Sequence, residues 1–476
     1  MESIQDKKHE EEEEIVAEPV SPTGQYINSS ALSLSIIAIL ELEIPFDESL
    51  TFPFLQDLLL RLNPRFSSVM VTDDHGVKQW KRVEVKLKDH VKIPSFPMDV
   101  SKERYDMYLD DYLSEIANAE LPKEQPLWEL HIFKYPTSNA TGTIIFKLHH
   151  ALGDGFYLMG ILFSCCNSVD NPSNPIMLPS LRSRSKPSDH DITYNIRKLV
   201  KRFRFMLLDT ASVFAWTCRK CSIVEDDKTP IRSGNEGVEF RPMAISTINF
   251  SLDHIKQIKN KLAVTVNDVI TGIVLYGTRL YMQNVSSEDS GMTKSSAAIL
   301  VNTRAFNNYQ TIEKMASSAK SLPGNQFAFI HVSTPKTTDV ELADPLEFIH
   351  KAKKRIQKQR SSLALHLTGK LLKIITKLRG PEATAQYIHG TIRKSSFGIS
   401  NMIGPIEHIA FANHPCKGMY FMPVGVPYSL NITVLSYMGN VRVALGTEKG
   451  FINHPVLINC LEKAFDRTFA AALATS

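Results

Sequence analysis

The chain has 476 residues, of which 43% are hydrophobic and 22% charged, and its formal net charge is +4. This length predicts two domains of roughly 200 residues each, and the composition is that of a globular protein. The six cysteines are irregularly spaced, which excludes a disulfide framework and predicts a reducing compartment.

Charge is unevenly distributed along the chain. Residues 1–20 carry eight acids and two lysines, a net charge of about −6, so the rest of the chain carries about +10. We interpret residues 1–20 as a disordered acidic tail that lacks the apolar segment of a signal peptide. The basic remainder suits an anionic ligand or a membrane surface and does not point specifically to nucleic acid.

Helix-forming and strand-forming patterns alternate after the tail. In 81–91, apolar and charged residues alternate as they do in a half-exposed strand. Residues 170–190 are rich in Pro, Ser and Arg, which predicts a linker. The elements predicted before the linker are helices at 54–62 and 108–121 and strands at 81–91, 127–134 and 142–150.

The region between the predicted lobes contains two ambiguous features. The apolar segment 205–216 has basic flanks, but it is short for a bilayer span and contains Asp209, so a packed helix, an interfacial helix and a span all stay open. Cys218 and Cys221 form a CxxC pair without a second pair at zinc-finger spacing, which argues against a metal site there.

The second half also mixes helices and strands. The helix at 267–283 has Thr265 or Asn267 as its N-cap, and the helical region 351–379 holds ten Lys and Arg residues and no acid. We divide the chain into a tail (1–20), an N-terminal lobe (21–180), a linker (181–240) and a C-terminal lobe (241–476). The other elements predicted here are strands at 296–304 and 326–334, a strand followed by a turn at 397–405, a strand meander at 419–447 and a helix at 454–472.

The most informative segment is IIFKLHHALGDGF, 144–156, in which two histidines end a predicted strand. Alternation along the strand places His149 and His150 on opposite faces, so one imidazole can point into a channel while the other packs. Gly153 and Gly155 permit a tight turn, and Asp154 can bond backbone amides or pair with a cation. A neutral imidazole can accept the proton of a hydroxyl that attacks a thioester. A structural pair and a metal site are the alternatives.

Several motifs, in the same order along the chain, resemble those of the bifunctional wax ester synthase/diacylglycerol acyltransferases, most closely their plant branch. HHALGDG at 149–155 resembles the family signature HHxxxDG. The other similar segments are EPVSP at 18–22, PLWELHI at 126–132, NDV at 267–269, GNQ at 324–326 and SNMIGP at 400–405. The resemblance implies a two-lobed α/β fold of the chloramphenicol acetyltransferase type, shared by the CoA-dependent acyltransferases.

The resemblance also implies a role for each site residue. His150 is the expected general base, His149 assists it or shapes the site, and Gly155 keeps a channel open. Asp154 is expected to hold the loop through a basic partner, for which Arg304 is the candidate. Asn267 and Asn401 are candidates for polarising the thioester carbonyl, with helix capping and turn formation as their alternative roles.

The implied reaction moves a fatty acyl group from acyl-CoA to a long-chain alcohol, or to diacylglycerol, without an acyl-enzyme, a cofactor or a metal. The implied location is the cytosolic face of the endoplasmic reticulum membrane, with the plasma membrane as the alternative. The basic region 351–379 is expected to meet anionic headgroups or CoA phosphates, or to be a solvated helix face.

Two other functions compete with this one. Plant acyltransferases of specialised metabolism share HxxxD, but they also carry a DFGWG motif that this chain lacks. A non-catalytic acyl-CoA- or lipid-binding protein would have no need of the complete HHALGDG segment. The segment NMIGP at 401–405 departs from the family pattern after the Asn, which concerns chain-length preference more than activity.

Overall fold

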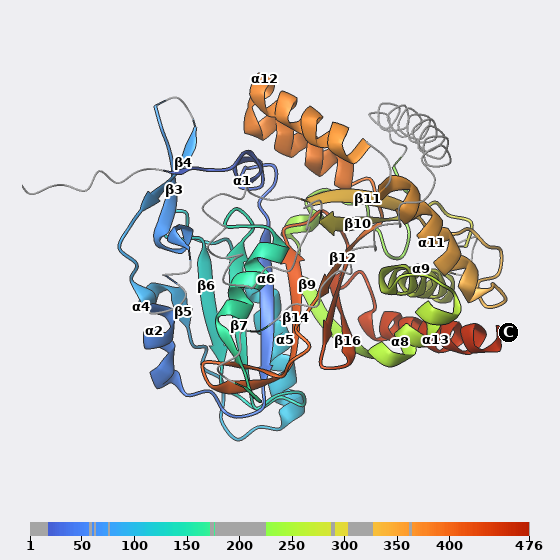
Figure 1. The fold of residues 1–476 in the computed structure, drawn as a ribbon, viewed down its shortest axis with the longest axis horizontal. Coiled ribbons are helices and arrows are strands. Elements are labelled where there is room, and N and C mark those ends of the chain that lie inside the picture. The colour runs from blue at the N-terminus through green and yellow to red at the C-terminus, as the bar shows by residue number, and fades with distance from the viewer. Residues whose placement is uncertain are drawn as a thin grey trace, which may run out of the picture.

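The computed structural model describes residues 18–56, 60, 63–74, 77–171, 176, 225–286, 291–302, 327–360 and 364–475. Its strands form two large mixed sheets, and these build two lobes that lie side by side (Figure 1). A small antiparallel sheet of β1 (Glu18–Pro19), β4 (Lys78–Arg82) and β3 (Ser68–Thr72) adjoins the first lobe.

The first lobe is built on a 7-stranded sheet. Two adjacent inner strands of this sheet, β7 (Gly142–His149) and β2 (Ser35–Leu42), are buried along their whole length. Ile37 and Ile145 pack against α5 (Lys102–Asn118). Phe146 faces the other way, into the core that contains α6 (Gly155–Ser164). Helices on both faces explain why these strands are almost continuously apolar. In order across the sheet the strands are β5 (Val91–Lys92), β6 (Trp128–Phe133), β7 (Gly142–His149), β2 (Ser35–Leu42), β14 (His414–Val424), β13 (Ile409–Phe411) and β8 (Cys166–Ser168).

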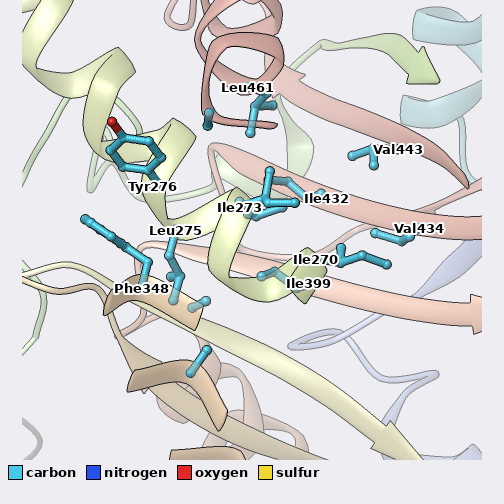
Figure 2. Close-up of a cluster of buried hydrophobic side chains, with 14 of the residues drawn as sticks. Ile270, Ile273, Leu275, Tyr276, Phe348, Ile399, Ile432, Val434, Val443 and Leu461 are labelled. Carbon is cyan, nitrogen blue, oxygen red and sulfur yellow. The ribbon is translucent and has the colours of Figure 1, made fainter. Parts of the chain in front are cut away.

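The second lobe is built on a 6-stranded sheet. Helix α9 (Val266–Val285) is its central helix, and Figure 2 shows Ile273 of α9 beside Ile432 of the sheet. In order across this sheet the strands are β11 (Phe327–Ser333), β10 (Ser296–Asn302), β12 (Phe397–Ile403), β15 (Leu430–Tyr437), β16 (Asn440–Glu448) and β9 (Met243–Ser251).

Two glycines let α9 approach its neighbouring helices closely. A Cβ atom at Gly272 would lie 2.7 Å from the Cα of Ile349 on α11 (Pro345–Arg360), and one at Gly277 would lie 3.0 Å from the Cα of Leu461 on α13 (His454–Ala474). The remaining helices of the described residues are α1 (Pro22–Tyr26), α2 (Thr51–Phe54), α4 (Leu87–His90), α8 (Leu252–Lys261) and α12 (Ala364–Ile392), with short 3₁₀ turns at Glu48–Leu50, Pro64–Ser67 and Val238–Phe240.

Most predicted elements are present, but the strand expected over 81–91 is wrong. After β4 the chain leaves the sheet and forms the single turn α4. Val85, between β4 and α4, and Leu87, the first residue of α4, are partly buried against the first-lobe core. The alternating apolar residues therefore find a core without pairing in a ladder, which periodicity alone does not distinguish from a strand.

The meander expected over 419–447 is also wrong, because its first strand belongs to the other lobe. Strand β14 pairs with β2 of the first sheet, whereas β15 and β16 pair with each other in the second. A strand from the predicted C-terminal lobe thus completes the N-terminal one. The boundary at 241 also differs, since Asp226, assigned to the linker, accepts the backbone N–H groups of Ser296 and Ser396.

The predicted acidic tail ends earlier than expected. Glu18 and Pro19 pair with β4, and Val20 is buried. The rest of the predicted tail, residues 1–17, lies outside the described residues, as does the segment 205–216 together with Cys218 and Cys221. In the described part of the chain, no helix is both long enough and apolar enough to cross a membrane.

Candidate active site

The HHALGDG segment connects the end of β7 to the start of α6, near the centre of the molecule (Figure 1). Strand β2 holds the histidines by backbone pairing, because His149 is in register with Ser35, and the His150 N–H donates to the Leu34 carbonyl at 2.8 Å. The expected strand, turn and helix are confirmed in this segment.

His149 is a buried imidazole with both ring nitrogens engaged. Its Nδ1 accepts the backbone N–H of Ala151 at 3.1 Å, so the proton must be on Nε2, which lies 3.2 Å from Ser33 Oγ. Burial is the main cause that lowers the pKa of His149 to about 3, and the nearby His150 and Lys78 add to the effect. The ring is therefore neutral and held in one tautomer, which suits a positioning role.

His150 is the second buried histidine of the pair, with 6% of its surface exposed. It directly follows His149, the last residue of β7. Leu148, two positions earlier, packs in the core on the α6 side of the sheet. The same short segment, Ser33 and Leu34, bonds both histidines, through the ring of His149 and the backbone of His150. The two imidazoles are thus fixed together by the residues that precede β2.

Asp154 is the N-cap of α6. Its Oδ1 accepts the backbone N–H of Tyr157 at 3.0 Å, and the residue is 4% exposed. A carboxylate at this position satisfies a free helix N–H and interacts favourably with the helix dipole. Arg304, the basic partner expected for Asp154, lies outside the described residues, as does the GNQ segment at 324–326.

The two glycines of the motif have different surroundings. A Cβ atom at Gly153 would lie 2.2 Å from Cδ1 of Tyr157, which no alanine could tolerate without movement of the ring. A Cβ atom at Gly155 would lie 3.6 Å from Sδ of Met402 and 3.7 Å from Cδ1 of Ile36, which are ordinary contacts. Gly155 therefore marks the place where the first lobe meets strand β12 of the second.

The structure brings Asn267 and Asn401 together, although they are 134 positions apart in the chain. Nδ2 of Asn401, on β12, donates to Oδ1 of Asn267 at 3.0 Å. Asn267 does not cap α9, because Thr265 is the N-cap and forms a reciprocal capping box with Asp268. Asn401 precedes Met402 on β12, and successive side chains of a strand point to opposite faces, so the amide pair lies on the face of β12 opposite to the Met402 side chain that contacts Gly155.

Several residues that the sequence did not single out brace the HHALGDG loop. Nη1 of Arg65 donates to the Leu152 carbonyl at 3.3 Å, and the amide of Asn63 donates to the hydroxyl of Tyr157. Ser33 bonds His149, as described above. Nothing local in the sequence indicates these partners, because each lies far from the loop along the chain.

The described residues contain no group of three His, Cys, Asp or Glu side chains that could hold a metal ion. The HHALGDG loop combines an imidazole pair with a capped helix start, and a separate pair of carboxamides joins β12 to the start of α9. Such groups can accept a proton and donate hydrogen bonds to a developing oxyanion.

Two sequence models of one family together match most of the chain. The model of the wax ester synthase/diacylglycerol acyltransferase catalytic domain matches residues 54–270, and that of the corresponding C-terminal domain matches residues 323–468. Wax ester synthase/diacylglycerol acyltransferase 11 of Arabidopsis thaliana is 28% identical, with 93% of this chain and 92% of that protein covered. Wax ester synthase/diacylglycerol acyltransferase 4 of the same plant is also 28% identical, with 94% of this chain and 88% of that protein covered.

Solved structures show the same fold. A wax ester synthase/diacylglycerol acyltransferase from Marinobacter aquaeolei VT8 superposes with a TM-score of 0.59 at 16% identity, covering 96% of this chain and 99% of that one. A variant of the starter condensation domain of rhizomide synthetase, in complex with C8-CoA, superposes with a TM-score of 0.54 at 10% identity. The match covers 97% of this chain and 96% of that one. These matches confirm the predicted two-lobed, chloramphenicol-acetyltransferase-like α/β fold.

Proposed function

Because the chain belongs to the wax ester synthase/diacylglycerol acyltransferase family, we propose that it transfers a fatty acyl group from acyl-CoA to a long-chain alcohol. The product is a wax ester, and diacylglycerol is the second acceptor, giving triacylglycerol. The observation that carries the proposal is the HHALGDG loop, with His149 locked in one neutral tautomer and Gly155 facing the second lobe. The names of the Arabidopsis relatives support both acceptors.

In the proposed mechanism His150 is the general base. It accepts the hydroxyl proton while the alcohol oxygen bonds to the thioester carbonyl carbon. The carbon–sulfur bond of the resulting intermediate then breaks, and the departing CoA sulfur accepts from His150 the proton that came from the alcohol. The acyl group passes directly to the acceptor, with no covalent acyl-enzyme and no cofactor or metal.

The remaining site residues position the reacting groups. His149, held by Ser33 and Ala151, orients the loop that carries His150. Asn401 and Asn267 are proposed to donate amide hydrogens to the carbonyl oxygen of the thioester, where negative charge develops. Their mutual hydrogen bond supports this role, because it restrains the amide of Asn401 before substrate binds.

We propose that the enzyme works at a membrane surface, on the cytosolic face of the endoplasmic reticulum. Long-chain alcohols and diacylglycerol partition into bilayers, so the enzyme must reach them there. The four described cysteines (Cys165, Cys166, Cys416 and Cys460) are free thiols, which agrees with a reducing compartment. Microscopy of a fluorescent fusion would distinguish this location from the plasma membrane.

The test uses purified protein with radiolabelled palmitoyl-CoA and either hexadecanol or diacylglycerol, followed by separation of the neutral lipids. We expect labelled wax ester from the unaltered chain and a loss of roughly 10²-fold or more in His150→Ala. His254→Ala is the matched control, since His254 is an exposed residue of α8 in the second lobe, and it should keep full activity.

Each other outcome points to a different function. Label only in triacylglycerol would keep the mechanism and reverse the order of acceptors. Ester formation with short specialised alcohols alone would favour a soluble acyltransferase of specialised metabolism. Binding of acyl-CoA without transfer to any acceptor would indicate a non-catalytic binding protein, and equal activity of His150→Ala would remove His150 from the mechanism.

A further inference from the structure

Helix α12 is a helical hairpin. Gly380 has a φ of +83°, outside the helical range, and Pro381 follows it. Oγ1 of Thr376 and Oγ1 of Thr384 are 2.9 Å apart, although they are separated by eight positions. In a continuous helix such residues would lie about 12 Å apart along the axis. The chain therefore reverses at Gly380, and we call residues 364–379 the first arm and 381–392 the second arm.

The second arm is packed against the body of the molecule. Thr384 and Ala385 are fully buried, and Ala385 belongs to the core of the first lobe. Oε1 of Glu382, near the turn, accepts hydrogen bonds from Ser30 Oγ at 2.6 Å and from the Ala31 N–H at 3.1 Å. This arm fixes the hairpin on the first lobe.

The first arm presents an apolar and basic face to solvent. Ile374 is 54% exposed and Leu378 is 76% exposed. They are four positions apart, so they lie on the same face of the helix. Lys373, Lys377 and Arg379 are exposed beside them. Paired apolar side chains flanked by cations are characteristic of helices that lie in the interface of an anionic bilayer.

The hairpin is anchored beside the segment that holds the histidine loop. Glu382 bonds Ser30 and Ala31, and two residues further along the chain Ser33 bonds His149. Figure 1 shows α12 at the upper edge of the molecule above α1, and the β3–β4 hairpin rises to the same edge. That hairpin also exposes apolar side chains, those of Val71 and Val77.

We propose that the first arm of α12 is a membrane-docking helix for anionic phospholipid. Ile374 and Leu378 insert at the boundary between headgroups and acyl chains, while Lys373, Lys377 and Arg379 contact headgroup phosphates. Charge complementarity favours this occupant, because the sequence of the first arm has four Lys and Arg residues (Lys370, Lys373, Lys377 and Arg379) and no acid. The inference deepens the proposed function and rests on it in one respect, since docking here brings the bilayer that holds the acceptor next to the histidine loop.

The test measures sedimentation of the full-length protein with sucrose-loaded vesicles, in the absence of acyl-CoA and alcohol. The vesicles contain phosphatidylcholine alone or with 30% phosphatidylserine. We expect binding to the anionic vesicles that weakens with salt, and a loss of roughly 10²-fold in Ile374→Glu/Leu378→Glu. Lys373→Glu/Lys377→Glu should bind the two kinds of vesicle equally weakly.

Leu342→Glu is the matched control. Leu342 is 85% exposed and lies in the loop before α11, so the substitution adds a charge at an apolar surface position outside the hairpin and should leave vesicle binding unchanged. The substituted side chains are exposed, so thermal unfolding should show that every variant stays folded.

Unchanged vesicle binding by Ile374→Glu/Leu378→Glu, or no binding by the unaltered chain, would overturn the proposal. A dimer of the unaltered chain that this variant abolishes would also overturn it, because the face would then bind a second copy. The vesicle assay contains no substrate, so its result stands whether or not the ester assay supports the proposed function.

Discussion

At the scale of single residues, the two neighbouring histidines are held in different ways. His149 is bonded at both nitrogens and deprived of water, so its neutral form is strongly favoured. His150 is anchored through its backbone N–H by the same segment. We infer that the first imidazole sets the geometry in which the second can accept a proton.

The neutrality of His149 predicts a pH dependence of stability. Its pKa falls from an ordinary 6.5 to about 3 in the folded protein. Between these values only the unfolded chain binds the proton, so the free energy of unfolding falls by about 1.4 kcal/mol per pH unit as pH decreases. This contribution is complete above pH 6.5. His149→Asn, which keeps an acceptor for the Ala151 N–H, should reduce the slope between pH 6.5 and 4.5 by about one proton.

Urea unfolding of both proteins at several pH values between 4.5 and 7.5 measures this slope. His254→Ala, at an exposed position on α8, supplies the comparison for a histidine outside the buried loop. If the curves of the unaltered chain and His149→Asn were parallel, His149 would not be the residue whose protonation opposes folding.

At the scale of elements, the turn between β7 and α6 depends on the ring of Tyr157. That ring occupies the space a side chain at Gly153 would need, and its hydroxyl accepts a hydrogen bond from Asn63. The backbone N–H of Tyr157 donates to Asp154. The family resemblance implied an open channel at Gly155, yet the steric requirement is stronger at Gly153.

The two glycines therefore form a matched pair of substitutions. Gly153→Ala should lower the free energy of unfolding by about 1–3 kcal/mol, because the ring must move and lose its partners. Gly155→Ala should change stability by less than about 0.5 kcal/mol, because its Cβ meets only ordinary contacts. Denaturant unfolding of both variants decides the matter, and equal losses would contradict the steric explanation.

At the scale of the whole molecule, a buried ion pair joins the two sheets. Arg442 on β16 bonds Glu41 on β2, and their side chains are 12% and 7% exposed. The guanidinium also donates to Asn249 on β9 and lies 5.6 Å from the ring centre of Tyr420 on β14. A Cβ atom at Gly418 would be 2.4 Å from the Glu41 carboxylate, so the strand leaves room for the pair.

Removing one partner should leave an unpaired buried charge between the lobes. We expect Arg442→Met to lower the free energy of unfolding by about 3–5 kcal/mol, and the double variant with Glu41→Gln to recover much of that loss. Lys449→Ala, which breaks a solvent-exposed pair with Asp111, should cost less than about 1 kcal/mol. If the losses in the free energy of unfolding of Arg442→Met and Glu41→Gln simply added in the double variant, Arg442 and Glu41 would stabilise the fold independently.

The sequence by itself determined the elements whose signals are local. The apolar run before the histidines specified β7, and the period of 267–283 together with Thr265 specified α9. These two elements depend on neighbours within a few positions, so periodicity and capping suffice to predict them. The fold type was implied by the resemblance of the ordered motifs to a known family.

Only the tertiary structure decided the relations between distant segments. Ser33 and His149 are 116 positions apart, and Asn267 and Asn401 are 134 apart. Strand β14 joins the first sheet by pairing with β2, and the first arm of α12 turns its apolar face outward because the second arm takes the packing surface. Each of these contacts depends on which surfaces remain available for burial after the other segments have packed. A local sequence pattern contains no information about those distant surfaces.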